Sequence, residues 1–204
     1  MIEALAAARV LPVVAIDDPA AVGDLCASLL EGGVACIEIT FRTSAAEQAI
    51  AGAAEVDGML VGAGTVLTAE QARAATAAGA AFAVAPGLDA EVVAACAELG
   101  LPFFPGVATP TELGRALGLG CTVVKVFPAA QLGGPAFLRA VSATFPHARF
   151  VPTGGIDAET LESYLAVPQV LACGGSWIAD RALIAERRFD EVTRRARAAV
   201  AVAA

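Results

Sequence analysis

The chain has 204 residues, of which 57% are hydrophobic, and it carries a formal net charge of −8 at pH 7. This length predicts a single domain over residues 1–204, and an acidic balance without a basic cluster excludes nucleic acid as an expected partner. The mean hydropathy of +0.70 reflects abundant alanine, and no run of about 18 apolar residues predicts a membrane span.

The N-terminus lacks the pattern of an export signal, since Glu3 replaces positive charge and Arg9 interrupts the apolar residues. We therefore expect a cytoplasmic protein. The five cysteines are widely spaced without a C-x-x-C motif, which predicts reduced, buried thiols. His147 is the only histidine and lies in a polar turn, so it is expected at the surface. No metal site and no cofactor are expected.

Short runs rich in valine and isoleucine alternate with alanine-rich stretches of helical length. Strands are predicted at 10–16, 35–40, 59–62, 81–85, 103–105, 122–127, 149–152 and 170–173. Helices are predicted at 19–31, 45–55, 69–78, 90–99, 110–119, 135–144, 158–165 and 181–200. Asp18, Thr109 and Asp157 stand where capping residues precede helices.

Eight strand–helix pairs in about 200 residues predict a compact (β/α)8 TIM barrel of α/β class. An open, doubly wound sheet is the alternative, and it requires a glycine-rich phosphate loop such as G-x-G-x-x-G after the first strand. Residues 16–19 (IDDP) follow that strand instead. The sequence therefore favours the barrel, with functional groups at the carboxyl ends of its strands.

The second predicted strand ends with two polar residues on one face. Glu38 and Thr40 alternate with Ile37, Ile39 and Phe41, so the carboxylate points into the barrel if the isoleucines pack against helices. A buried carboxylate is suited to proton transfer. The alternative is an ion pair with Arg42 or Lys125 that only stabilises the fold.

Glycines follow three other predicted strands. Gly62 and Gly64 precede Thr65, whose hydroxyl either faces the site or caps a helix. The pairs Gly154-Gly155 and Gly174-Gly175 follow the last two strands, and Ser176 adds a hydroxyl donor after the second pair. Such pairs also occur in ordinary turns, but at the ends of strands seven and eight they indicate a phosphate site.

Lys125 is the only lysine, and the other twelve basic residues are arginine. It lies within the apolar run 122–127 (TVVKVF), which predicts a buried strand. Burial disfavours the ammonium form, and a neutral amine adds to carbonyl groups to form Schiff bases, which arginine cannot do. The alternative is that the side chain extends to solvent from the strand end.

Seven motifs resemble, in the same order, those of the bacterial KDPG/KHG aldolases, which are class I aldolases of 2-dehydro-3-deoxy-6-phosphogluconate and 4-hydroxy-2-oxoglutarate. The motifs are residues 38–43 (EITFRT), 61–66 (VGAGTV), 86–87 (PG), 105–110 (PGVATP), 125–129 (KVFPA), 152–156 (PTGGI) and 174–177 (GGSW). Together they extend over nearly the whole chain.

This resemblance implies a homotrimeric, metal-free lyase of the Entner–Doudoroff pathway that cleaves a 2-oxo-3-deoxy-4-hydroxy acid to pyruvate and an aldehyde. Its small-molecule substrate would be a 2-oxo acid phosphate. Lys125 would form the Schiff base and Glu38 would act as acid and base. Arg42 and Thr65 would bind the carboxylate, Pro86 and Phe127 would line the site, and Thr153, Gly154, Gly155, Gly174, Gly175 and Ser176 would bind the phosphate.

Two positions depart from this family pattern, because Ala85 replaces a common serine and Ala130 a common glutamate. Two other functions stay open on the residues alone. One is a phosphate-binding barrel that isomerises or decarboxylates sugar phosphates, with Lys125 as a charged donor beside an aspartate. The absence of an aspartate next to Lys125 in the sequence argues against this. The other is a non-catalytic barrel that binds an anionic metabolite.

Overall fold

The computed structural model describes residues 1–203, in which parallel strands form a six-stranded and a three-stranded sheet. The strands are β1 (Val10–Val14), β2 (Cys36–Thr40), β3 (Leu60–Gly64), β4 (Phe82–Val84), β5 (Phe103–Phe104), β6 (Gly106–Val107), β7 (Val123–Val126), β8 (Arg149–Pro152) and β9 (Cys173–Gly175). The sheet orders are β5-β4-β3-β2-β1-β9 and β6-β7-β8. The predicted α/β class is confirmed, since helices connect the parallel strands.

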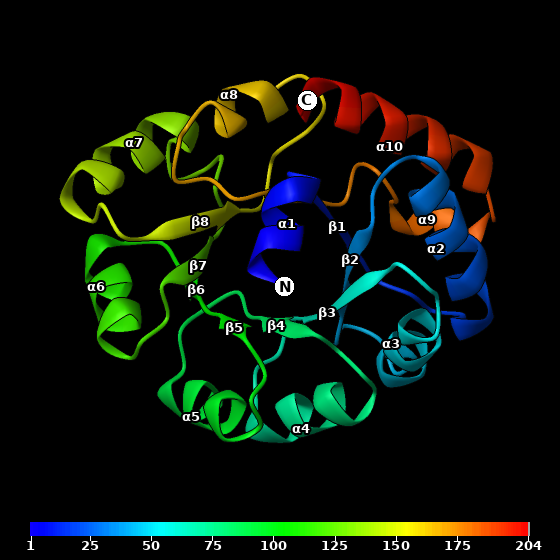
Figure 1. Cartoon of the computed structure of the whole chain (residues 1–204), viewed down its shortest axis with the longest axis horizontal. Coiled ribbons are helices and arrows are strands. Elements are labelled where there is room, and N and C mark those ends of the chain that lie inside the picture. Colours follow the sequence, from blue (N-terminus) through cyan, green and yellow to red (C-terminus); the bar gives the residue numbers. More distant parts are fainter. Residues whose placement is uncertain (204) are drawn as a thin grey trace.

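Helices surround the strands as a ring (Figure 1). They are α1 (Ile2–Ala8), η1 (Pro19–Ala21), α2 (Val22–Glu31), α3 (Ala46–Ala54), α4 (Ala69–Ala77), α5 (Ala90–Glu98), α6 (Pro110–Gly118), α7 (Gly134–Thr144), α8 (Leu161–Leu165), α9 (Arg181–Ala185) and α10 (Phe189–Ala203). Strands β1, β2 and β7 are buried along their whole length. Burial on both faces explains why these strands read as continuous apolar runs.

The two sheets approach each other at two places. Pro105 separates β5 from β6, so that Phe104 pairs with β4 whereas Gly106 pairs with β7. Proline has no N–H to donate, which explains why the strand predicted at 103–105 is interrupted there. On the opposite side, Thr153 directly after β8 forms an isolated parallel bridge with Gly174 in β9.

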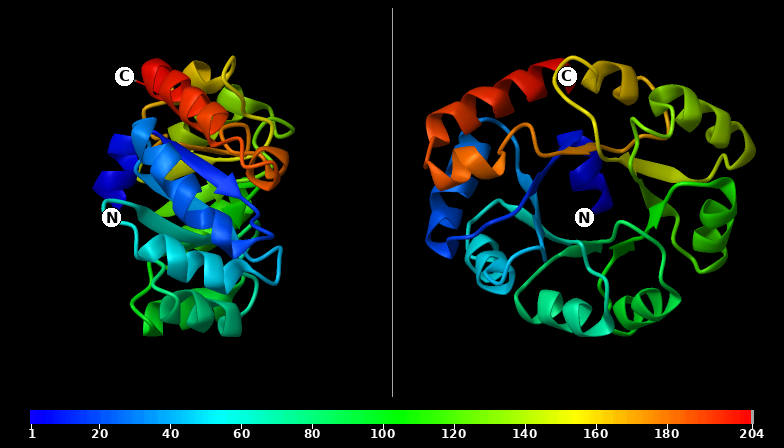
Figure 2. Two further views of the ribbon diagram at one scale, coloured as in Figure 1. Left: turned by 90° about the vertical axis from the view of Figure 1, so that its right-hand side faces the viewer. Right: turned by 180° about the vertical axis from the view of Figure 1, so that it is seen from behind.

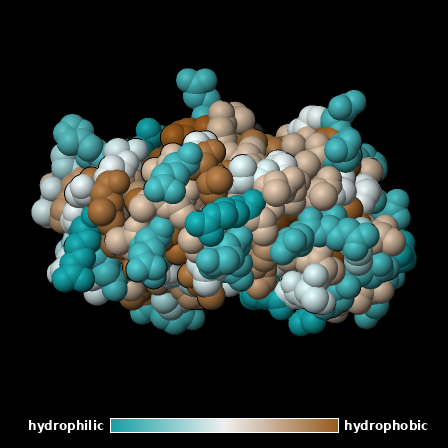
Figure 3. Space-filling view, turned by 90° about the horizontal axis from the view of Figure 1, so that it is seen from below, coloured by the Kyte–Doolittle hydropathy of each residue, from teal (hydrophilic) through white to brown (hydrophobic). Residues whose placement is uncertain are grey.

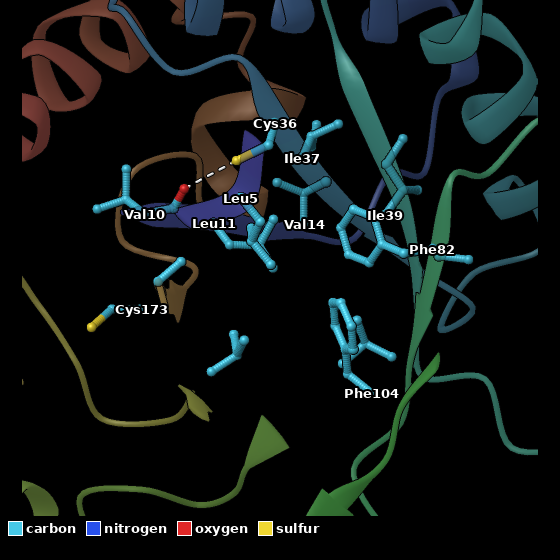
Figure 4. Packing of buried hydrophobic residues seen from close by; sticks show 14 of the residues in the cluster. Leu5, Val10, Leu11, Val14, Cys36, Ile37, Ile39, Phe82, Phe104 and Cys173 are labelled. Carbon is cyan, nitrogen blue, oxygen red and sulfur yellow. Dashed lines mark hydrogen bonds between the residues drawn. The ribbon is translucent and has the colours of Figure 1, made fainter. Parts of the chain in front are cut away.

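The N-terminal helix α1 was not predicted. It lies at the centre of the ring in Figure 1, and Figure 2 places it on the face where the strands begin. Its Leu5 is fully buried and belongs to the same hydrophobic core as Leu11 and Phe82 (Figure 4). This helix therefore covers one end of the fold, and the carboxyl ends of the strands remain available on the other face.

The predicted helix at 181–200 is wrong, because this stretch forms two helices, α9 and α10. Arg187 lies between them with φ of 52°, in the left-handed region. Its guanidinium forms ion pairs with Asp18 at 2.9 Å and Asp24 at 3.6 Å. The stretch contains no glycine or proline that would have indicated the break.

Other boundaries differ by a few residues. The strand predicted at 170–173 lies at Cys173–Gly175, the one predicted at 59–62 continues to Gly64, and the helix predicted at 158–165 begins at Leu161. The capping predictions for Asp18 and Thr109 are confirmed, since Asp18 accepts from the backbone N–H of Ala20 and Thr109 forms a reciprocal capping box with Glu112. The prediction for Asp157 is wrong, because its carboxylate accepts from the backbone N–H of Thr160 at 3.0 Å in the turn before α8, and α8 itself begins at Leu161 without a side-chain cap.

The surface is mixed rather than uniformly polar. Viewed from the side of α4 and α5, hydrophobic residues lie between hydrophilic ones (Figure 3).

Over residues 1–203, no helix has both the length and the apolar character needed to span a bilayer. The prediction for His147 is confirmed, since this residue is exposed in the turn before β8.

Candidate active site

A cavity of about 310 Å³ opens among the carboxyl ends of the strands. Eleven of the twelve predicted site residues line it, namely Glu38, Arg42, Thr65, Pro86, Lys125, Phe127, Thr153, Gly154, Gly155, Gly175 and Ser176. Val13, Thr40 and Ile156 complete the lining, and Gly174 does not contribute to it. Residues from seven different strand ends thus meet in one place, as expected for chemistry on this face of an α/β fold.

Lys125 and Glu38 form a buried pair at the base of this cavity. The Lys125 Nζ lies 3.2 Å from Glu38 Oε1, although the two residues are 87 positions apart in the chain. Lys125 is 5% exposed and Glu38 is fully buried. The sequence left open whether Glu38 forms an ion pair with Arg42 or with Lys125, and the structure shows the pair with Lys125. A proton can therefore pass directly between this amine and this carboxylate.

The second carboxylate oxygen of Glu38 has no partner. Oε2 is buried and forms no hydrogen bond within residues 1–203. The neighbouring strand leaves room for the carboxylate at Gly64, because a Cβ there would overlap Glu38 Oε1. A buried carboxylate oxygen without a donor is costly, and burial of this kind is typical of functional sites. Oε2 therefore keeps the capacity to accept a hydrogen bond.

Phe127 and Pro86 form part of the apolar wall. The Lys125 Nζ lies 5.7 Å from the centre of the Phe127 ring, and Phe127 is 37% exposed. Pro86 is held close to the start of β6, since Gly106 donates to the Gly87 carbonyl at 3.1 Å and a Cβ on Gly106 would overlap the Pro86 backbone. These residues limit the access of water to the amine.

Arg42 and Thr65 bring polar groups to the cavity from the ends of β2 and β3. Arg42 is exposed and has no carboxylate within 4 Å among the described residues. Thr65 adopts φ of 56°, a left-handed conformation that is uncommon for a residue other than glycine. Such strain is frequent at functional sites. The alternative that Thr65 caps a helix is wrong, because Thr68 caps α4.

Backbone donors surround the other end of the cavity. Gly154 and Gly155 have φ of 98° and 73°, a conformation in two successive residues that requires glycine. In the hydrogen bonds of residues 1–203, the N–H groups of Gly154, Gly155 and Ser176 donate to no acceptor. The helices that follow, α8 and α9, are five residues each, so the loops rather than helix ends supply these donors.

Gly174 lies behind the cavity and not in its wall. A Cβ on Gly174 would overlap Thr153 Oγ1, so this glycine allows the Thr153 side chain to face the cavity. A Cβ on Gly175 would overlap the ring of Trp177. Arg195 in α10 donates to the Trp177 carbonyl at 2.7 Å and so fixes the loop after β9. The sequence alone gave no indication of this anchor.

Thiols and carboxylates do not assemble a metal site. No group of three His, Cys, Asp or Glu residues within the described part of the chain could hold a metal ion. All five cysteines are free, and burial raises the pKa of Cys36 and Cys173 to about 12. These two thiols are therefore neutral at pH 7 and are poor nucleophiles.

The two departures from the family pattern lie near the site but not within it. Ala85 is buried beside Pro86, and it does not line the cavity. Ala130 is exposed and packs close to Gly155, where an added Cβ on the glycine would contact it. Neither alanine lines the cavity, and the pair of Lys125 and Glu38 is formed between two other residues.

Comparisons with known proteins give a consistent result. The family model described as KDPG and KHG aldolase matches residues 1–195. The 2-dehydro-3-deoxy-phosphogluconate aldolase of Treponema pallidum is 49% identical over 94% of this chain and 91% of that protein. The KHG/KDPG aldolase of Escherichia coli K12 is 39% identical over 94% of this chain and 90% of that protein.

A solved structure of KDPG aldolase from Legionella pneumophila, with pyruvate captured as a covalent carbinolamine intermediate, superimposes with a TM-score of 0.93. It is 38% identical, and the match covers 97% of each chain. Sequence and structure agree over the strands that form the cavity as well as over the surrounding helices. The chain therefore belongs to the KDPG and KHG aldolase family.

Proposed function

We propose that this protein is a class I aldolase that cleaves 2-dehydro-3-deoxy-6-phosphogluconate to pyruvate and glyceraldehyde 3-phosphate. The observation that carries this proposal is the buried pair of Lys125 and Glu38, both of which line a cavity of about 310 Å³. The same site would cleave 4-hydroxy-2-oxoglutarate to pyruvate and glyoxylate, because this acid shares the 2-oxo and 4-hydroxy groups.

The reaction begins with carbon–nitrogen bond formation. The Lys125 amine adds to the C2 carbonyl, and Glu38 transfers protons to and from the carbinolamine until water leaves and a protonated imine remains. The substrate carboxylate binds to the Arg42 guanidinium and the Thr65 hydroxyl. Both groups line the cavity, and Arg42 has no carboxylate partner of its own among residues 1–203.

Carbon–carbon cleavage follows from the charge on the imine. Glu38 removes the proton of the C4 hydroxyl, the C3–C4 bond breaks, and its electron pair moves into the imine to give an enamine and the free aldehyde. Protonation of C3 and hydrolysis through Glu38 then release pyruvate and regenerate the amine. One carboxylate performs every proton transfer, which requires it to alternate between acid and base.

One observation favours the alternative enzyme, an isomerase or decarboxylase in which Lys125 is a charged donor. Lys125 has no aspartate as a sequence neighbour, but the ion pair with Glu38 that the sequence left open is formed, at 3.2 Å. An isomerase or decarboxylase with a charged lysine could use such a pair, whereas only the aldolase requires a covalent bond at the amine. Covalent trapping therefore separates the aldolase from both alternatives, the charged-lysine enzyme and the non-catalytic binder of anionic metabolites.

The test is reduction with borohydride in the presence of pyruvate. We expect one stable adduct on the peptide that contains Lys125, measured by mass spectrometry, because the only other primary amine is the N-terminus. A control without pyruvate should give no adduct. Folded protein that forms no adduct with pyruvate would exclude the aldolase, and loss of the aldolase would leave the charged-lysine enzymes and the binder.

Substrate preference should depend on the phosphate group. The free N–H groups of Gly154, Gly155 and Ser176 and the Ser176 hydroxyl are suited to hold it. Contacts to this remote group support kcat as well as KM, since they keep the reacting atoms aligned. We therefore expect a strong preference for the 6-phosphorylated acid over its dephosphorylated form.

Ser176→Ala is the appropriate variant, because a side chain at Gly174 would displace Thr153 and disturb the pocket wall. Loss of a hydrogen bond to a charged group should lower kcat/KM for the phosphorylated acid by about 10–100-fold. Turnover of 4-hydroxy-2-oxoglutarate should change by less than about threefold, as should both activities in the control Ser44→Ala, at an exposed serine. Equal losses for both substrates would exclude a phosphate contact at Ser176.

The proposal extends to the closure of the barrel and to the oligomeric state. The bridge between Thr153 and Gly174 and the shared segment around Pro105 support a closed (β/α)8 barrel built from both sheets. We further propose that residues 1–204 act as one catalytic domain, that the domain assembles as a homotrimer and that it works in the cytoplasm without a cofactor. Light scattering of the purified protein would test the trimer.

A further inference from the structure

Thr40 is a polar residue of the cavity to which the sequence assigned no role. It follows Glu38 by two positions in β2, so both side chains lie on the same face of the strand. Thr40 is 1% exposed, yet it lines the cavity. Its hydroxyl donates to the Val14 carbonyl at 2.8 Å and accepts from Arg42 Nε at 3.0 Å. A buried hydroxyl thus connects the end of β1 with the arginine.

The direction of these two hydrogen bonds is fixed by chemistry. A hydroxyl has one proton, and the Val14 carbonyl can only accept it, so the oxygen lone pairs of Thr40 turn toward Arg42. The Nε of a guanidinium can only donate. In the two hydrogen bonds that connect Arg42, Thr40 and Val14, each donor and each acceptor is therefore fixed. These bonds orient the plane of the guanidinium.

This orientation decides which atoms of Arg42 remain for a ligand. A carboxylate can bind a guanidinium side-on, through Nε and one Nη, or end-on, through both Nη groups. Because Thr40 occupies Nε, the end-on geometry remains. Arg42 also lacks a carboxylate within 4 Å in residues 1–203, whereas Arg181 has one and Arg187 and Arg195 each have two. Both Nη groups are thus available beside Lys125 and Glu38.

We propose that Thr40 is a positioning residue that holds Arg42 so that its two Nη groups bind the carboxylate of the 2-oxo acid end-on. This inference rests on the proposed function, since it requires a 2-oxo acid at Lys125. Thr40 itself does not contact the reacting atoms in this arrangement. Its contribution is to orient a long, exposed side chain before the substrate arrives, which lowers the entropic cost of binding.

Thr40→Val tests the hydroxyl with almost no change in shape. The variant leaves both Arg42 Nε and the Val14 carbonyl without this partner, and Thr40→Ser restores the hydroxyl. The readout is the concentration of ketone that gives half-maximal borohydride trapping at Lys125. We expect Thr40→Val to raise this concentration for pyruvate by about 2–10-fold, the usual effect of having to order one long side chain on binding. Thr40→Ser should recover most of the loss.

Acetone provides the matched control, because it forms the same imine but has no carboxylate. Trapping with acetone should be the same in the wild type, Thr40→Val and Thr40→Ser. A parallel loss with acetone would assign Thr40 to the amine or to the fold and overturn the proposal, as would normal pyruvate trapping in Thr40→Val. Wild-type protein that forms no adduct with either ketone would instead overturn the proposed function.

Two further measurements test the link between Thr40 and Arg42, and the second of them does not depend on trapping. In the background of Arg42→Leu, Thr40→Val should cause no additional loss of pyruvate trapping, because a residue that acts through Arg42 has no effect without it. The ¹⁵N-labelled Arg42 Nε–H should exchange slowly with solvent in the wild type and rapidly in Thr40→Val. Equal exchange rates in both proteins would show that the hydroxyl does not hold the guanidinium.

Discussion

Lys125→Arg is expected to abolish imine formation with pyruvate and all aldol cleavage, while the protein remains folded. Arginine keeps a positive charge beside the fully buried Glu38, but its guanidinium does not deprotonate and cannot attack a carbonyl. Replacement by an uncharged residue would leave Glu38 buried without its partner, which typically costs about 3–5 kcal/mol of folding stability. Arginine therefore separates chemistry from stability better than methionine or alanine.

The measurement combines three observations on wild type and variant. Borohydride trapping with pyruvate should label the Lys125 peptide in the wild type and no peptide in the variant, apart from slow reaction at the N-terminal amine. Turnover of both acids should disappear, and the unfolding temperature should stay close to that of the wild type. Persistent turnover in Lys125→Arg would contradict the Schiff-base mechanism.

Glu38→Gln is expected to reduce kcat by about 10²–10⁴-fold, the usual contribution of a general acid–base group. Glutamine keeps the size of the side chain and can still accept a hydrogen bond from Lys125, so substrate binding should be largely preserved. It cannot exchange protons with the carbinolamine or remove the proton of the C4 hydroxyl. The loss should therefore appear in kcat rather than in KM.

The control is Glu162→Gln at an exposed position of α8, which should have wild-type kinetics. Single-turnover measurements with pyruvate and borohydride should show slower imine formation in Glu38→Gln, because carbinolamine dehydration needs the same proton transfers. Normal turnover in Glu38→Gln would assign this carboxylate a structural role, as the partner that keeps Lys125 charged and in place.

Local patterns were sufficient to predict most elements of this fold. Alternating apolar runs and alanine-rich stretches gave nearly every strand and helix, because hydrophobic periodicity reflects which residues face the core. The capping box at Thr109 and Glu112 was predictable for the same reason, since all its partners lie within one turn. Lys125 could be identified without a structure because a single lysine in a buried strand conflicts with ordinary burial preferences.

Tertiary contacts decided the features that no local pattern contains. At the break between α9 and α10, Arg187 forms exposed ion pairs with Asp18 and Asp24, more than 160 positions earlier in the chain. The interruption at Pro105 was visible as a proline, but only the pairing of β5 with β4 and of β6 with β7 makes it a change of sheet. Helix α1 is part of the fold because Leu5 fills the end of the core.

The candidate active site shows most clearly what the sequence determined and what the tertiary structure decided. The sequence by itself determined which residue types stand at the strand ends, including Lys125, Glu38 and the paired glycines. Only the tertiary structure decided that Glu38 pairs with Lys125 and not with Arg42, that Gly174 supports Thr153, and that Thr40 holds Arg42. The physical reason is that residue type and periodicity fix the direction of a side chain within its own strand, whereas its partners depend on which strand lies beside it and in which register.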